Sequence, residues 1–329
     1  KKLKKIIQTT RECEKIFNKK FLDIEFAFSN NQLYVLQVRA IITNNKENLS
    51  DINLSKSLNK LEKKIEKLNS AHPNLLGDKT IFSVMTDWNP AEIIGLRPKK
   101  LALSLYKELI TDETWAYQRD NYGYRRLRSH PLLVSFLGVP FIDVRVSFNS
   151  FIPKSLDEKT AIKLVNYYLN ELSKNLKYHD KVEFEIIYSC YYFGLEKKLL
   201  KLLKYGFNKK ELNNIKNSLL GITNSIINIK DGLYKKDLNK SKLLDTKFND
   251  VVNSDLPLID KIYWLIKDVK RYGTLPFAGV ARAGFISVQI LNSFIEEKII
   301  THNEYDKFLK SLNTVSKQLS KDDKILSEK

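Results

Sequence analysis

The sequence contains few of the residues that form disulfides or bind metal ions in small proteins. Its 329 residues include two cysteines, Cys13 and Cys190, one methionine and four histidines. Two distant cysteines provide neither a disulfide framework nor the paired spacing of a zinc site, which favours a reducing, cytoplasmic environment. No uninterrupted apolar run approaches the roughly 18 residues of a membrane span, and no signal peptide is visible. We therefore expect no membrane association.

Acidic residues are too few to balance the lysines and arginines, and the formal net charge of the chain is +18. The lysines are spread over many predicted helices, and no helix-turn-helix, zinc-finger or RNA-binding motif accompanies them. Charge alone carries no sequence specificity, so we expect no specific nucleic-acid partner. The length favours two domains. Because the chain opens with Lys1 and not with Met, we expect a piece of a longer polypeptide.

The hydrophobic spacing predicts a mainly α fold with a small β component, an α+β protein. A helix is expected over 5–19, strands over about 21–28 and 33–39, and a polar connector over 44–51, where Ser50 and Asp51 cap the next helix. Residues 81–153 are irregular, apart from a helix over about 99–120. Further helices are expected over 157–175, 179–205, 209–228, 236–253, 256–271, 276–298 and 302–320, several with good caps at Asp157, Asn208 and Thr301.

The stretch from Asp23 to Arg39 predicts a hairpin that carries functional groups. Glu25, Gln37 and Arg39 share the parity of a pleated strand, so each arm can direct them to one face. A carboxylate, an amide oxygen and a guanidinium suit a magnesium-bound polyphosphate, because Mg²⁺ prefers oxygen ligands and arginine forks onto phosphate oxygens. A plain edge hairpin with polar decoration is the alternative.

Two loops of the second half carry candidate binding residues. Asp87 and Asn89 either border a ligand pocket or belong to a well-capped helix that starts at Pro90. Tyr124 and Arg125, next to Gly123, either form an anion or carboxylate site or are ordinary solvated side chains.

Alternation predicts a polar strand face formed by Asp143, Arg145, Ser147 and Asn149. Such a face either points to water or grips an amino-acid zwitterion, with Arg145 on the carboxylate and Asp143 on the ammonium group. Arg282 lies among alanines and glycines that permit close approach. Since charged residues are rarely buried without a partner, we interpret Arg282 as a contact for a substrate carboxylate or phosphoryl group.

The hairpin resembles the end of the ATP-grasp domain in the phosphoenolpyruvate synthase and pyruvate phosphate dikinase superfamily. That family has Asp-Ile-Glu-aromatic, a short turn, and then Leu-Gln-x-Arg with the Gln twelve residues after the Glu, as Glu25 and Gln37 are here; Ala40 replaces the usual proline. The resemblance implies that ATP and Mg²⁺ are cofactors, that Glu25 and Gln37 are magnesium ligands and that Arg39 contacts phosphate. It assigns residues 1–44 to the end of the ATP-grasp domain, 45–79 to a linker and helix, and 80–329 to a mostly helical acceptor domain.

Motifs of the second domain, such as Met-Thr-Asp-Trp-Asn-Pro-Ala-Glu at 85–92 and Gly-Thr-Leu-Pro-Phe-Ala at 273–278, are similar to those of the L-glutamine kinases of capsular phosphoramidate biosynthesis. This resemblance implies a kinase in which ATP phosphorylates a swivelling histidine, leaving AMP and phosphate, and the histidine then phosphorylates the amide of L-glutamine. The swivelling-histidine motif and the ATP-grasp lid are absent from this sequence, so no catalytic residue is assigned and the fragment alone is expected to be inactive. Open alternatives are a phosphoenolpyruvate synthase, a rifampin-type phosphotransferase, and a non-catalytic helical binding module.

Overall fold

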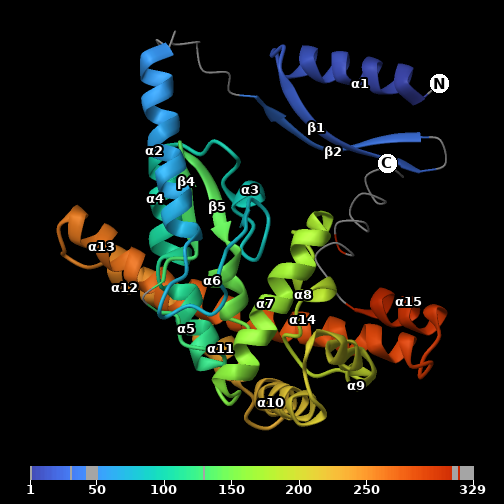
Figure 1. Ribbon diagram of the computed structural model, residues 1–329. Helices are drawn as coiled ribbons and strands as arrows, with labels where there is room; N and C mark the ends of the chain where they lie inside the picture. The colour runs from blue at the N-terminus through green and yellow to red at the C-terminus, as the bar shows by residue number, and fades with distance from the viewer. Residues whose placement is uncertain (1, 30–31, 42–50, 129, 313–317, 319–329) are drawn as a thin grey trace. The chain divides into compact units, whose positions relative to one another are not determined.

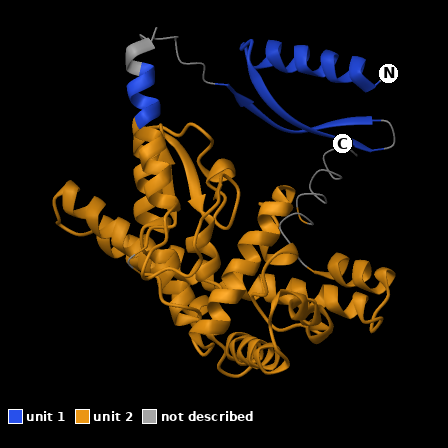
Figure 2. Ribbon diagram, in the orientation of Figure 1, with its two compact units in different colours: residues 1–59 blue, residues 60–329 orange. Residues whose placement is uncertain are grey.

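The chain divides into two compact units, residues 1–59 and 60–329 (Figure 2). The computed structural model describes residues 2–29, 32–41, 51–128, 130–312 and 318. The division falls inside helix α2 (Asp51–Asn69), in the segment that the sequence assigned to a linker and helix. Most of the predicted connector, including the cap at Ser50, lies outside the described residues.

The first unit contains helix α1 (Lys2–Ile16) and a hairpin of β1 (Leu22–Ser29) and β2 (Gln32–Ala40). The strands are antiparallel, and the register shifts between Glu25 and Phe26. Half-buried Ile24 and Val38 face each other as partners, between pairs of exposed polar residues. This alternation is what a strand with one wet face produces. The predicted hairpin is confirmed.

The second unit contains a small antiparallel sheet in the order β3 (Phe82–Ser83), β5 (Val139–Asp143), β4 (Leu133–Phe136). A two-residue turn, Leu137-Gly138, joins β4 to β5, and both of its residues have positive φ, 51° and 87°. A turn of this kind matches the twist of the flanking strands and favours glycine. It places the end of β5 next to the helices that form the rest of the unit.

Helices make up most of the second unit (Figure 1). Asp157, Asn208 and Thr301 cap their helices as predicted, and the last two form capping boxes. The prediction of a mainly α protein with a small β part is therefore confirmed. The helices are α3 (Pro90–Ile93), α4 (Lys100–Tyr106), α5 (Thr114–Asn121), α6 (Val144–Asn149), α7 (Glu158–Lys174), α8 (Val182–Glu185), α9 (Leu195–Leu199), α10 (Lys209–Ile227), α11 (Leu233–Ser241), α12 (Leu244–Val252), α13 (Leu258–Asp268), α14 (Leu275–Glu296) and α15 (His302–Ser311), with the 3₁₀ segments η2 (Leu176–Tyr178) and η3 (Leu200–Tyr205) and the π-helical segments η1 (Lys107–Thr111) and η4 (Val269–Thr274).

Three predicted helices are wrong as continuous elements. The helix expected over 236–253 is divided between α11 and α12. The expected helix over 99–120 is α4, η1 and α5 in succession, because a π-helical segment and a turn interrupt the hydrogen-bond ladder. The expected helix over 179–205 is α8, then the non-helical residues 186–194, then α9 followed directly by η3. Gly194 has φ of 76° and lies against the side chain of Glu297, where a Cβ would collide. That backbone conformation ends helical continuity.

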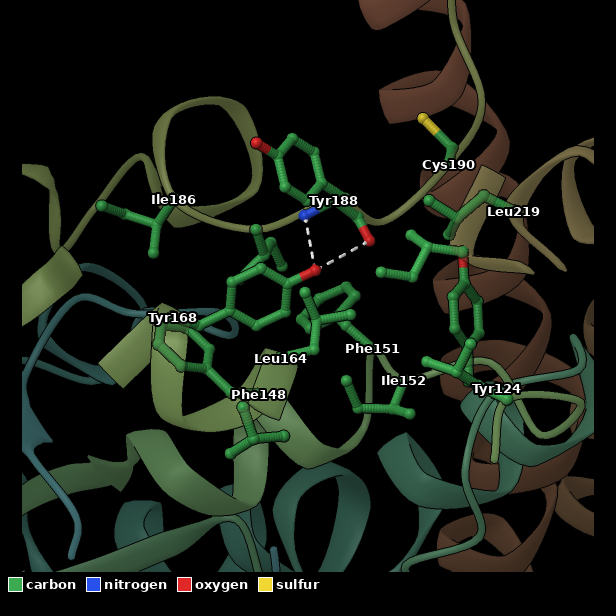
Figure 3. Close-up of a cluster of buried hydrophobic side chains, with 14 of the residues drawn as sticks. Tyr124, Phe148, Phe151, Ile152, Leu164, Tyr168, Ile186, Tyr188, Cys190 and Leu219 are labelled. Atoms are coloured by element: carbon green, nitrogen blue, oxygen red, sulfur yellow. Dashed lines mark hydrogen bonds between the residues drawn. The ribbon is translucent and has the colours of Figure 1, made fainter. Parts of the chain in front are cut away.

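The main core of the second unit is rich in tyrosine (Figure 3). Tyr168 lies fully buried, accepts a hydrogen bond from Tyr188 N at 3.0 Å and faces Tyr188 O at 3.5 Å. A buried phenol needs such partners, because an unpaired hydroxyl in a core is costly. The loop that replaces the predicted helix is thus fixed to α7 by its backbone.

The helical run Leu258–Glu296 joins α13, η4 and α14, which the sequence had divided into two helices. By length and composition alone it is apolar enough to cross a membrane. A mostly buried core helix of a soluble protein meets the same test; here 28% of the apolar window is buried, and α14 contributes Ala278, Ala283 and Ile286 to the buried residues of this unit. Gly279 lets α11 approach α14, since a methyl group there would overlap Asp237 and Tyr122.

Candidate functional site

The hairpin brings Glu25, Gln37 and Arg39 together. Glu25 and Gln37 are cross-strand partners, and Arg39 Nη2 donates a hydrogen bond to Gln37 Oε1 at 2.6 Å. The same guanidinium nitrogen lies 3.8 Å from Glu25 Oε1. The side chains of Arg39 and Glu25 are 46% and 59% exposed, so the cluster is open to a ligand.

The cluster offers two oxygen ligands, one carboxylate and one amide. Among the described residues no group of three or more His, Cys, Asp or Glu side chains is placed to hold a metal ion. Mg²⁺ is usually held by one or two carboxylates together with phosphate oxygens and waters, not by a protein cage. Glu25 and Gln37 thus supply two oxygen atoms of the kind that ligate Mg²⁺, and Arg39 supplies donors of the kind that phosphate oxygens accept.

The predicted polar strand face at 143–149 is wrong. β5 ends at Asp143, which caps helix α6 by accepting a hydrogen bond from Val146 N at 3.2 Å. Residues two apart in a helix do not share a face, so Ser147 points away from both Arg145 and Asn149, and the alternating set does not form one surface. Burial raises the pKa of the Asp143 carboxyl, and hydrogen bonds from Thr80 and Val146 oppose that shift.

Arg145 and Asn149 instead bind backbone groups of the segment after α2. Arg145 donates to Leu68 O at 2.8 Å and to Ser70 O at 2.7 Å, where helix α2 ends. A guanidinium suits the carbonyls of a helix C-terminus. Asn149 accepts from Leu76 N at 2.9 Å and donates to Leu76 O at 2.8 Å. These contacts give both side chains structural roles in place of the predicted zwitterion site.

The Tyr124 and Arg125 side chains lie apart from each other. Tyr124 is fully buried and donates from Oη to Ser189 O at 2.6 Å. Burial raises its pKa to about 12, so the phenol stays neutral. Arg125 borders a separate depression next to Lys154. Asn89 caps α3 through Glu92 N, as the alternative interpretation of that turn predicted.

Two of the predicted residues, Asp87 and Arg282, line one pocket of about 190 Å³. The loop before α3 carries Asp87, and α14 carries Arg282. The polar lining is completed by Gln118 and Arg119 of α5 and by Glu183 of α8. Trp88, Phe277 and Phe285 form aromatic walls. Apolar walls with a few convergent polar groups are typical of small-molecule sites.

Each arginine of the pocket has a carboxylate partner. Arg119 Nη2 donates to Asp87 Oδ1 at 2.8 Å, and Ser147 Oγ donates to the other oxygen of Asp87 at 2.8 Å. Arg282 pairs with Glu183. Burial disfavours the charge on Arg282, but Glu183 outweighs it, and the pKa of the guanidinium lies above its ordinary value. Both pairs are desolvated, so breaking either one leaves an uncompensated charge.

The Phe151 ring lies under both guanidinium groups. Arg119 Cζ is 3.9 Å from the ring centroid, and Arg282 Cζ is 5.4 Å from it. A ring face attracts such cations and holds their planes in place. The two ion pairs are therefore fixed by packing as well as by charge.

Three donor atoms of the pocket have no hydrogen-bond partner among the described residues. They are Nε and Nη1 of Arg282 and Nε2 of Gln118, in side chains only 3% and 2% exposed. Buried donors are normally satisfied, and these three belong to side chains that line the pocket. A carboxylate or phosphoryl group supplies an acceptor for such donors, while Glu183 and Asp87 offer acceptors to an ammonium group.

Sequence reasoning missed Gln118, Arg119 and Glu183. Arg119 follows Trp115 by four residues on α5 and therefore lies on the same helical face. Since a tryptophan in a helix is usually buried, the sequence could have predicted that Arg119 is buried too. Gln118, three residues after Trp115, lies near the same face and could have been predicted less clearly. Glu183 lies in a four-residue helix within a region expected to be one long helix, and no local pattern singles it out.

No family model, no curated protein and no solved structure matches this chain.

Proposed function

We propose that this chain is part of an ATP-dependent phosphotransferase that acts through a phosphohistidine relay. The observation that carries the proposal is the exposed cluster in which Arg39 bonds Gln37 and faces Glu25. Its residue types match the phosphate-binding and magnesium-binding positions of the resembled superfamily. Phosphoryl transfer depends on positioning and charge neutralisation, which these three side chains supply.

The acceptor proposed for the second unit is a small zwitterion, with L-glutamine as the first candidate. The pocket offers unpaired donors on Arg282 and Gln118 for a carboxylate, and the carboxylates of Glu183 and Asp87 for an ammonium group. Its lining charges form two balanced pairs, which suits a ligand without net charge. The aromatic walls suit the apolar stem of an amino acid.

Calorimetric titration of the chain with L-glutamine tests the pocket. Gln118→Met removes an unpaired donor at similar volume, and Ala281→Leu fills part of the cavity from α14. We expect each to weaken binding by about tenfold or more, because lost polar contacts and lost space both act on a buried ligand. Gly284→Ala is the matched control, since a methyl group at that exposed position of α14 meets nothing within 4 Å.

Titrations with other acceptors distinguish between members of the superfamily. Pyruvate and rifampin are titrated in parallel with L-glutamine. Binding of either one that Ala281→Leu removes would favour the corresponding alternative acceptor. If L-glutamine binds equally well to wild type, Gln118→Met and Ala281→Leu, the pocket is not its site.

A further inference from the structure

A second pocket lies where the two π-helical segments meet, away from the residues discussed above. Lys270 of η4 donates to Glu108 of η1 at 2.8 Å, which ties the two segments together. π-Helical turns are rare and frequently mark functional sites. The pocket has a volume of about 410 Å³ and is lined by residues of α5, α11, α13 and η4.

The lining of this pocket is strongly cationic. It contains Lys240, Lys267, Lys270 and Arg271, and one carboxylate, that of Glu113. Within 4 Å, Glu108 and Glu113 pair with Lys267 and Lys270. Lys240 and Arg271 have no carboxylate within that distance in the described part of the chain. Four cations from three elements thus face two carboxylates, those of Glu108 and Glu113, and the excess of positive charge favours a bound anion.

An unpaired hydroxyl lies in the wall of the same pocket. Thr114 is 5% exposed, and its Oγ1 is buried with no hydrogen-bond partner among the described residues. Thr114 is the first residue of α5, and no side chain caps that helix end. A buried hydroxyl at an uncapped helix start adds a donor and a favourable dipole to the cations.

We propose that this pocket binds the phosphate group of a small ligand. Several lysines and an arginine surround it together with a hydroxyl donor, a combination that suits a tetrahedral, multiply charged oxyanion better than a single carboxylate. The contrast with the pocket at Arg282 is direct, since there the charges are balanced in pairs. The phosphate-pocket proposal does not depend on the proposed phosphotransfer.

The test is calorimetric titration with inorganic phosphate and, separately, with AMP, in low-salt buffer containing EDTA so that no magnesium site contributes. The double variant Lys240→Gln, Arg271→Gln should weaken binding of at least one of the two by about tenfold or more. The double variant Lys209→Gln, Lys210→Gln removes the same charge from exposed positions on α10 and should change affinity by less than about twofold. If only inorganic phosphate binds, the ligand is the free ion. If only AMP binds, the ligand is a phosphomonoester.

Thr114→Val separates binding from folding. The substitution keeps the shape and removes a hydroxyl that has no partner in the described structure, so it should not lower stability. We expect phosphate affinity to fall about threefold while tryptophan-detected unfolding stays unchanged. The proposal is overturned if both lysine-containing double variants weaken binding equally, if Thr114→Val leaves phosphate affinity unchanged, or if a short oligonucleotide binds at this pocket while phosphate and AMP do not.

Discussion

Two segments of this chain show the same alternation of polar and apolar residues, and they fold differently. From Glu25 to Arg39 the alternation belongs to two paired strands, and its polar residues stay exposed. From Asp143 to Asn149 it belongs to the end of one strand and a buried helix. The comparison teaches that period-two spacing over seven residues does not fix a strand unless a partner strand and a turn accompany it.

The second segment becomes helical because its polar groups are needed by the surrounding backbone. Asp143 caps α6, Arg145 binds the end of α2, and Asn149 binds both backbone groups of Leu76. The cap is local, but the contacts of Arg145 and Asn149 are long-range, and together they outweigh the strand propensity of this segment. In the described residues of the hairpin, Glu25, Gln37 and Arg39 bond one another and not a distant backbone group, so they remain exposed.

The largest expected effect follows from replacing Arg145 with methionine. The change keeps most of the side-chain volume and removes the donors to Leu68 O and Ser70 O. We expect the free energy of unfolding of the second unit to fall by about 2–4 kcal/mol, because hydrogen bonds from a buried charge are lost together. Urea unfolding followed by tryptophan fluorescence measures it, since Trp88, Trp115 and Trp264 all lie in this unit.

Arg145→Lys serves as the partial control, because it keeps the charge and loses the fork. A stability change under about 0.5 kcal/mol for Arg145→Met, accompanied by loss of L-glutamine binding, would return Arg145 to a role in the acceptor site and erase the contrast between the two segments.

The parts of the fold that could be predicted are those with local signals. The hairpin has a polar turn and two alternating arms, and α7, α10 and α15 have side-chain caps at their first turns. The interrupted helices could not be predicted in the same way. Residues 186–194 leave the helix because Tyr188 bonds Tyr168 and because Gly194 lies against Glu297, contacts that join residues 20 and about 100 positions apart.

Only the residues of the pocket at Arg282 that have local sequence signals could be predicted. Arg282 has a local signal, a charge among small residues, and Asp87 lies in a loop of unusual composition. Their partners Glu183 and Arg119 are defined only once α8 and α5 pack near α14 and the loop before α3. A charged residue expected to be buried predicts that a partner exists, but not which carboxylate it is.

A smaller effect distinguishes two aspartate caps by their response to pH. Burial raises the pKa of Asp143, so its ionisation disfavours folding: the stabilisation linked to its proton is present at low pH and is lost as pH rises through the folded-state pKa. Hydrogen bonds from Thr160 lower the pKa of Asp157, so its stabilisation is present at neutral pH and is lost as pH falls through the folded-state pKa. Relative to wild type, Asp143→Asn should therefore gain stability as pH rises from about 4 to 7, because the folded-state pKa of Asp143 lies above the ordinary value. Asp157→Asn should lose stability relative to wild type mainly as pH rises from about 2 to 5, because the folded-state pKa of Asp157 lies below the ordinary value.

Urea unfolding of both variants at several pH values provides the measurement, and each variant is the control for the other. Parallel slopes for Asp143→Asn and Asp157→Asn would mean that Asp143 is as well solvated as Asp157. In that case Asp143 would be available to a ligand, as the strand interpretation required.

The smallest effect on stability is expected at the hairpin. Arg39 is 46% exposed and touches Gln37 and Glu25 at the surface, so Arg39→Met should change local stability by about 0.5 kcal/mol or less. Hydrogen exchange of the peptide covering residues 22–40 measures that change. The same variant should weaken binding of magnesium-ATP by about tenfold, because a guanidinium fork to phosphate is lost. Arg11→Met removes an equal charge from exposed α1 and should leave binding unchanged. Loss of hairpin protection without loss of nucleotide affinity would make Arg39 structural, as Arg145 is, and would remove the observation on which the phosphotransferase proposal rests.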